Sequence, residues 1–136
     1  MPFVRDERPI SVFNVHERIR GDYAFTISDR NGVPVPASVL TAATMSLYLT
    51  SPNGVPFTYI NGRQAQDILN TNNVLISEGG RIVWDIQSAD MEHFDPTQFF
   101  EPRIAVFAFV WPEGVILHEV TFIVRQVPNS PLPLVL

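Results

Sequence analysis

The sequence of 136 residues contains no cysteine and no lysine, and charged residues make up only 17% of it. The absence of cysteine excludes a disulfide framework, a cysteine zinc site and thiol catalysis. All nine basic residues are arginine, and the net charge of -5 without a basic run argues against a nucleic-acid-binding surface. No apolar run approaches the ~20 residues of a membrane-spanning helix, and the charged start is unlike a signal peptide.

Sparse charge implies that something other than charged side chains covers part of the surface, because soluble domains have about 25% charged residues. Arginine without lysine has two explanations. Arginine tolerates interfaces that exclude water, where lysine is depleted, whereas GC-rich coding sequences favour arginine codons for reasons unrelated to structure.

Alternating apolar and polar residues, the pattern of a strand with one buried face, dominate the chain. This alternation runs over residues 21–28, 42–50 and 81–87, and Asn-Gly pairs that suit tight turns follow the first two segments. The predicted inward residues are Tyr23, Phe25, Ile27, Met45, Leu47, Leu49, Ile82, Trp84 and Ile86. We expect Trp84 to anchor the core, because its large ring contributes most on burial.

Two longer segments, residues 103–111 and 115–127, follow with a turn between them. The first is apolar on both faces, which is typical of a central strand or of one that a partner covers. Its apolar side chains are Ile104, Val106 and Val110 on one face, and Phe107, Phe109 and Trp111 on the other. A thin sandwich encloses so many rings only if the predicted helix or a partner covers one face, so the three aromatic residues are candidates for contact with a partner.

Residues 61–70 have helical rather than strand periodicity. Asn61 can cap the first turn, and Gln64 can return a hydrogen bond to it. The asparagine-rich run 70–73 favours a turn that would end the segment. We therefore predict a short helix near residues 61–70.

About seven short strands at roughly 8–12-residue spacing, without alternating β-α-β units, predict an all-β fold. We expect an immunoglobulin-like antiparallel β-sandwich with this one short helix inserted; a small barrel is the alternative. The sandwich is predicted to span residues 10–127, between an N-terminal arm of residues 1–9 and a proline-rich C-terminal arm of residues 128–136.

The C-terminal arm is apolar, and its prolines favour an extended chain. Alone it would be a frayed tail, but it can instead dock in a groove on a neighbouring subunit. Its candidate contact residues are Pro131, Leu132, Leu134 and Leu136.

Residues suited to catalysis or metal binding form no recognisable arrangement. The histidines at 16, 93 and 118 lack the spacing of metal ligands, and His118 shares a face with apolar neighbours, which favours a packing role. The run Asp90–Asp95 either binds a divalent cation or is a solvated loop. A nucleophile elbow and a glycine-rich phosphate loop are both missing, so we expect no enzyme activity, no cofactor and no bound metal.

The tripeptide Asn61-Gly62-Arg63 has a structural interpretation. Gly62 permits close approach of the chain, and Arg63 can bond a carboxylate such as Asp85 or Asp90. We expect this segment to lock the fold; a contact between Arg63 and a partner is the alternative.

The stretch Ile60–Val74, which holds Asn61-Gly62-Arg63-Gln64, resembles a recurring motif of small virion structural proteins of tailed bacteriophages. The segments Gly80–Ile86, with Trp84, and His118–Phe122 follow in the same order and spacing. Together they resemble an immunoglobulin-like module of phage tail and baseplate-associated proteins, similar to the N-terminal domain of siphophage upper baseplate proteins. Ala108 stands where relatives tend to carry a polar or acidic residue.

This resemblance implies a non-enzymatic virion protein, an adaptor or attachment module at the tail or head–tail region that assembles through apolar faces and terminal arms. The implied partners are further copies of the chain and portal, tail, fibre or capsid subunits, without nucleic acid or membrane. A capsid decoration protein is an alternative of the same class. A carbohydrate-binding β-sandwich for host attachment, with Tyr48, Tyr59 and Trp111 as candidate sugar contacts, is an alternative of another class.

Overall fold

The computed structural model describes residues 3–5, 11–16, 21–49, 58–91 and 100–125. Within these ranges strands dominate, and the helical elements are two short 3-10 helices, η1 (Ala37–Val39) and η2 (Ser88–Met91). The strands are β1 (Phe3–Arg5), β2 (Ser11–His16), β3 (Gly21–Thr26), β4 (Ala42–Leu49), β5 (Gln66–Asp67), β6 (Val74–Ile76), β7 (Arg81–Ile86), β8 (Phe100–Trp111) and β9 (Gly114–Arg125).

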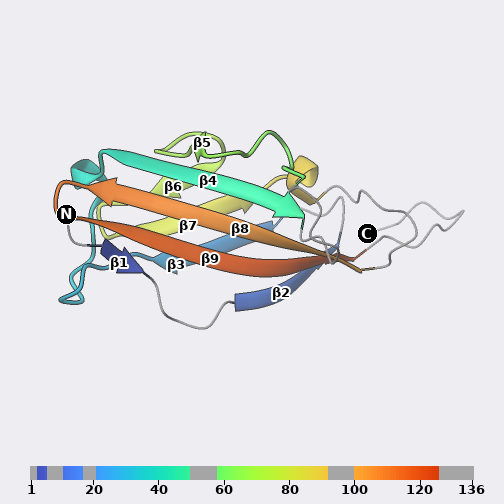
Figure 1. Cartoon of the computed structure of the whole chain (residues 1–136), viewed down its shortest axis with the longest axis horizontal. Coiled ribbons are helices and arrows are strands. Elements are labelled where there is room, and N and C mark those ends of the chain that lie inside the picture. Colours follow the sequence, from blue (N-terminus) through green and yellow to red (C-terminus); the bar gives the residue numbers. More distant parts are fainter. Residues whose placement is uncertain (1–2, 6–10, 17–20, 50–57, 92–99, 126–136) are drawn as a thin grey trace, which may run out of the picture.

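The strands form two sheets packed face to face (Figure 1). The larger sheet has the order β1-β9-β8-β4-β5 with β2 also paired to β9, and the smaller sheet has the order β3-β7-β6. The ladders among the described strands are antiparallel, except that β1 and β2 run parallel to β9. This order is that of an immunoglobulin-like sandwich, so the predicted fold class is confirmed; the very short β1 and β5 are additions to the seven expected strands.

The core lies between the sheets and is built from the inward residues of the alternating segments. On β7, Ile82 and Trp84 are 0% exposed and Ile86 is 1% exposed. The Trp84 ring meets Phe107 and Phe122 edge-on, with ring centroids 5.8 and 5.7 Å away. Such edge-to-face pairs stabilise a core beyond simple area burial. Trp84 is therefore the core anchor that the alternation predicts.

The β8–β9 hairpin runs the whole length of the larger sheet. Each strand has 12 residues, and the pairing extends from Phe100 opposite Arg125 to Trp111 opposite Gly114. In Figure 1 the turn between the two strands lies on the left and the C-terminal end of β9 on the right. The turn and Arg125 therefore lie at opposite ends of the domain.

The helix predicted near residues 61–70 is wrong, because this segment consists of turns followed by the two-residue strand β5. Its backbone bonds to β4 instead: Leu47 N donates to Arg63 O at 2.9 Å. Asn61 and Ala65 have φ values of 55° and 47°, which a right-handed helix does not allow. A helix this short is marginal on its own, whereas the edge of β4 offers the segment backbone hydrogen-bond partners.

The predicted arms are described only in small part. Within the N-terminal arm, Phe3–Arg5 form β1, which pairs with Val115–Leu117 at the start of β9. The C-terminal arm, residues 128–136, lies outside the described residues, as does the part of the acidic run beyond Met91. None of the helical elements in the described ranges has the length and hydrophobicity of a membrane-spanning helix.

Candidate functional site

Arg63 and Asp90 form a buried ion pair, with exposed fractions of 1% and 0%. Arg63 Nε donates to Asp90 Oδ1 at 2.6 Å, and Arg63 Nη2 donates to Asp90 Oδ2 at 3.2 Å. Arg63 Nη1 donates to Gln66 Oε1 at 3.0 Å and to the backbone oxygen of Asn72 at 3.1 Å. The planar fork of a guanidinium suits such a set of acceptors, and lysine could not reproduce it. The guanidinium carbon also lies 5.9 Å from the ring centroid of Trp84.

Asp90 connects three separate parts of the chain. Its Oδ1 also accepts from Asn61 Nδ2 at 2.9 Å, and its Oδ2 accepts from the backbone N of Gln87 at 2.8 Å. Its backbone oxygen accepts from Arg103 Nη1, and Arg103 Nη2 donates to Glu101 Oε1 at 2.6 Å. We call the cluster of Asn61, Arg63, Gln66, Asp90, Glu101 and Arg103 the Asp90 lock. It joins the turn segment before β5 to η2 and β8.

The lock contains part of the predicted motif and leaves part of it out. Of the two carboxylates proposed for Arg63, Asp90 is the one bound. Asn61 donates its side-chain amide to Asp90 and caps no helix. Gly62 has a φ of 66°, and a Cβ there would meet nothing within 4 Å, so glycine serves the turn and not a close approach. Gln64 is exposed, and no bond from it to Asn61 forms.

Several lock residues were not predicted from the sequence. Arg103 and Glu101 are 0% and 3% exposed on a strand that is otherwise apolar on its inner face. A charged residue at an inward strand position is the signal that could have identified them, because burial requires a partner. Asn72 has a φ of 53°, within the αL region that asparagine tolerates, and this turn presents its carbonyl to Arg63.

The contacts of the Asp90 lock suit a structural role. Four donor atoms saturate the two carboxylate oxygens of Asp90, which leaves no oxygen for a cation or a substrate. Elsewhere in the described part of the chain, no group of three or more potential metal ligands occurs. The acidic run Asp90–Asp95 therefore begins with a residue turned into the protein and not with a solvated one.

His118 ties the two sheets together. It is 7% exposed on the inner face of β9, and its Nε2 lies 2.8 Å from the Tyr23 hydroxyl on β3. Its ring stacks on Phe25 with centroids 3.9 Å apart and planes 7° from parallel. These contacts give His118 the packing role that its strand position predicts.

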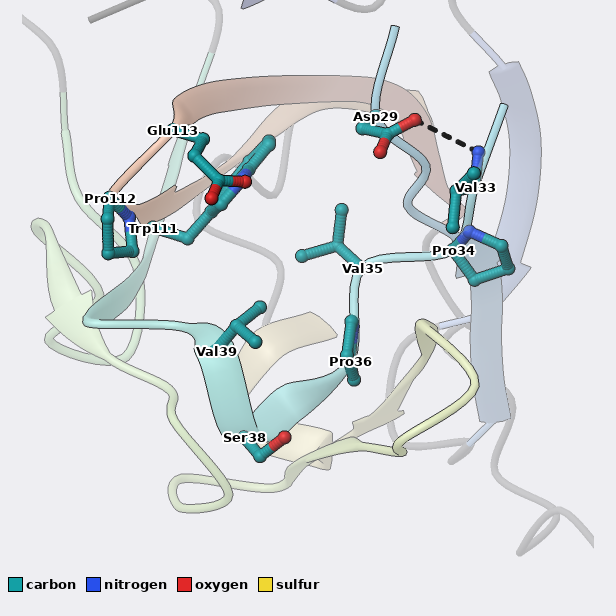
Figure 2. A pocket seen from close by; sticks show the side chains of 10 residues that line it. All are labelled: Asp29, Val33, Pro34, Val35, Pro36, Ser38, Val39, Trp111, Pro112 and Glu113. Carbon is teal, nitrogen blue, oxygen red and sulfur yellow. Dashed lines mark hydrogen bonds between the residues drawn. The ribbon is translucent and has the colours of Figure 1, made fainter. Parts of the chain in front are cut away.

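The aromatic residues of β8 point into the core. Phe107 and Phe109 are 0% exposed, and Trp111 is 5% exposed. The smaller sheet covers them: the ring of Phe25 lies 5.0 Å from that of Phe107. The prediction that these rings face a partner is therefore wrong for Phe107 and Phe109, whereas Trp111 lines a cavity (Figure 2). The other predicted contact residues, which belong to the C-terminal arm, lie outside the described residues.

The side of the larger sheet that points away from the smaller sheet is also apolar along β8, and we call this surface the outer face. The partly exposed, outward side chains of β4, β8 and β9 form it: Ala42, Thr44, Ser46, Tyr48, Ile104, Val106, Ala108, Val110, Val115, Leu117, Glu119, Thr121 and Ile123. Glu119 is the one charged residue among them. In Figure 1 this side of the larger sheet faces the reader, and no described element crosses β8 or β9.

Tyr48 lies at one end of the outer face. Burial, with the nearby charge of Glu119 and then Tyr59, raises the pKa of Tyr48 above the usual 10.0. Its ring meets that of Tyr59 edge-on at 6.1 Å, so the two tyrosines do not present one flat platform to a sugar. Trp111, the third candidate for sugar binding, is buried. At neutral pH Tyr48 is uncharged, because its pKa lies above 10.0.

The sequence matches no protein-family model, and no curated protein shows significant similarity to it.

Proposed function

We propose that the protein is a non-enzymatic structural component of a tailed-phage virion. In this proposal it acts as an adaptor or attachment module at the tail or head–tail region, and its partners are further copies of itself and portal, tail, fibre or capsid subunits. The observation that carries the proposal is the outer face of three adjacent strands, where Glu119 is the one charged residue among the outward side chains that the structure describes. The sequence resemblance described above supplies the virion setting.

The outer face differs from the solvated face of an ordinary antiparallel sheet. Such a sheet alternates between apolar residues inside and polar residues outside, whereas β8 carries Ile104, Val106, Ala108 and Val110 on its outer side. Depletion of charge is the compositional mark of the centre of a protein interface. Covering this face removes apolar area from water, which stabilises an assembly by roughly 25 cal/mol per Å². A protein that works by being packed between other subunits accounts for these features.

The Asp90 lock is consistent with a structural role. It holds a long turn segment against η2 and β8 through buried, charge-assisted hydrogen bonds, which are the stronger kind. A module that transmits force or sets spacing between neighbours needs its loops fixed in this way. The lock offers no open ligand position, as a catalytic carboxylate would require.

Incorporation into particles tests the proposal. Ala108 lies between Thr44 and Leu117 at the centre of the outer face, so Ala108→Glu places a charge there without disturbing the core. The matched control is Leu75→Glu, because Leu75 is 68% exposed on β6 of the other sheet. Melting temperatures of both variants establish that each is folded.

We expect quantitative mass spectrometry of purified phage particles to find the wild type and Leu75→Glu at equal copy number. Ala108→Glu should be present at about one tenth of that copy number or less, which corresponds to a loss of ~1.4 kcal/mol in the free energy of association. Absence of the wild-type chain from particles would overturn the proposal. Equal incorporation of Ala108→Glu would show that the outer face is not the assembly surface. Immunogold labelling then distinguishes a tail or head–tail position from that of a capsid decoration protein.

A further inference from the structure

A cavity of about 470 Å³ lies beside the β8–β9 turn, and we call it the loop cavity. Its volume is within the ~300–1,000 Å³ range of ligand pockets. It is lined by Asp29, Val33, Pro34, Val35, Pro36, Ser38, Val39, Trp111, Pro112 and Glu113. The lining is thus mainly valine, proline and one tryptophan, with a carboxylate on each of two sides (Figure 2).

The loop cavity has a buried floor and an exposed apolar rim. Val35 and Trp111 are 3% and 5% exposed, whereas Val33 and Val39 on the rim are 55% and 41% exposed. Apolar side chains exposed to this degree around a hollow mark a surface that takes an apolar occupant. The aromatic floor with a proline-containing rim matches the grooves that bind extended, proline-rich segments.

The polar groups of the loop cavity suit a peptide backbone. Asp29 Oδ1 accepts from the backbone N of Asn31 at 2.8 Å and of Val33 at 3.0 Å, which fixes the carboxylate in place. In Figure 2 its other oxygen points toward the cavity, and Glu113 stands on the opposite side. An extended polyproline-type segment keeps its N–H groups unbonded, so carboxylates at the rim can accept from them.

This chain contains a segment of that chemistry. Residues 128–136 read Pro-Asn-Ser-Pro-Leu-Pro-Leu-Val-Leu and carry no charged side chain. Two carboxylates therefore do not repel these side chains, and the prolines lower the entropy cost of ordering the segment on binding. Leu132 and Leu134 stand next to Pro133, and their apolar side chains match the apolar floor and rim of the loop cavity.

Geometry decides which copy supplies the segment. Arg125 pairs with Phe100 at the far end of the hairpin, and the eleven residue steps from Gly114 to Arg125 span roughly 36 Å at ~3.3 Å per residue. Leu134 follows Arg125 by nine residues, so even a fully extended chain carries it at most ~32 Å. The segment around Pro133 therefore falls short of the β8–β9 turn of its own chain, beside which the loop cavity lies.

We propose that the loop cavity binds the Pro131–Leu134 segment of a second copy of this chain. The inference deepens the proposed function, because it names one contact through which copies assemble. Since Arg125, the last described residue before the segment, and the loop cavity lie at opposite ends of the domain, each copy can give a segment to one neighbour and receive one from another. Such heterologous contacts generate rings when the rotation closes.

Peptide binding tests the cavity directly. A fluorescent peptide of residues 126–136 is titrated with the full-length protein and followed by anisotropy. Val39→Asp and, independently, Val33→Asp place a charge on the exposed rim without touching the core. Leu75→Asp is the matched control, because Leu75 is exposed on β6 and does not line the loop cavity. We expect saturable binding to the wild type and to the control, and at least about tenfold weaker binding to both rim variants. Absence of binding to the wild type, or equal binding to the rim variants, would overturn the inference.

Mixing experiments test the exchange between copies. Full-length protein with Leu132→Asp and Leu134→Asp combined lacks a competent segment, and Val39→Asp lacks a competent cavity. Light scattering should show less association for each variant alone and a one-to-one pair in an equimolar mixture, since the mixture restores one complete contact and leaves no second one to extend it. Absence of this pair would refute exchange between copies. Particle incorporation is a separate measurement, so failure of the peptide to bind leaves the virion proposal standing, and a chain absent from particles can still bind the peptide.

Discussion

Replacing Asp90 by asparagine should remove most of the stabilisation that the Asp90 lock provides. The side chain keeps its volume, so no cavity forms, but one oxygen becomes an amide NH₂. Each carboxylate oxygen accepts from two donors: Asn61 and Arg63 Nε at Oδ1, and Arg63 Nη2 and Gln87 at Oδ2. Whichever way the asparagine turns, two donors face its NH₂ group, and the Arg63 guanidinium stays buried without a countercharge.

The expected magnitude follows from burial. Removing one partner of a buried ion pair costs about 3–5 kcal/mol, because the other charge remains desolvated. Asp90 is 0% exposed and Arg63 1%, so solvent screening does not reduce this figure. A loss of about 4 kcal/mol is a large part of the roughly 5–15 kcal/mol that stabilises a domain. It lowers the urea midpoint by roughly 2 M and the melting temperature by about 10–15 °C.

Urea unfolding at neutral pH, followed by tryptophan fluorescence, measures the change. Asp22→Asn is the control, because Asp22 is exposed on β3 and its variant should stay within about 0.5 kcal/mol of the wild type. Combining Asp90→Asn with Arg63→Met removes the unpaired charge, so the double variant should lose less than the sum of the two single losses. A loss below about 1 kcal/mol for Asp90→Asn, or additive losses in the double variant, would refute this account of the lock.

Two further predictions concern a turn and a surface phenol. Gly80→Ala should lower the free energy of unfolding in urea by at least about 2 kcal/mol, because its Cβ would lie 2.7 Å from the Ile27 carbonyl oxygen at a φ of +74°. The control Gly62→Ala has a similar φ but open space around its Cβ, so it should cost about 1 kcal/mol. Equal losses for the two variants would contradict the steric reason. The raised pKa of Tyr48 means that the unfolded chain releases this proton first, so stability falls as pH rises above 10.0. Tyr48→Phe should show a smaller drop in urea midpoint between about pH 9 and about pH 11, and an unchanged drop would exclude Tyr48 as the source.

The alternation of the chain was sufficient to predict the longer strands and which of their residues point inward. Ile82, Trp84 and Ile86 were assigned to the core from period-two spacing alone, and they are buried. Side chains of a strand alternate between faces for purely local reasons, so a single sequence carries this information. The same spacing separates the two faces of β8 correctly.

The sequence could not decide which apolar face of β8 the protein covers itself. Phe107 and Phe109 were candidates for contact with a partner, yet Phe25 on the smaller sheet packs against both, with ring centroids 5.0 and 5.9 Å away. Both faces of the strand are apolar, and the choice between them depends on where a second sheet lies. That position is set by contacts between residues far apart in the chain.

The Asp90 lock shows the same division. The sequence by itself placed Arg63 within reach of a carboxylate and Trp84 in the core. Only the tertiary structure selected Asp90 over Asp85, replaced the predicted helix at residues 61–70 by pairing with β4, and enclosed Arg103 with Glu101. Local spacing fixes which way a side chain points, whereas the partner of a buried charge and the conformation of a marginal segment depend on hydrogen bonds that form only when the sheets come together.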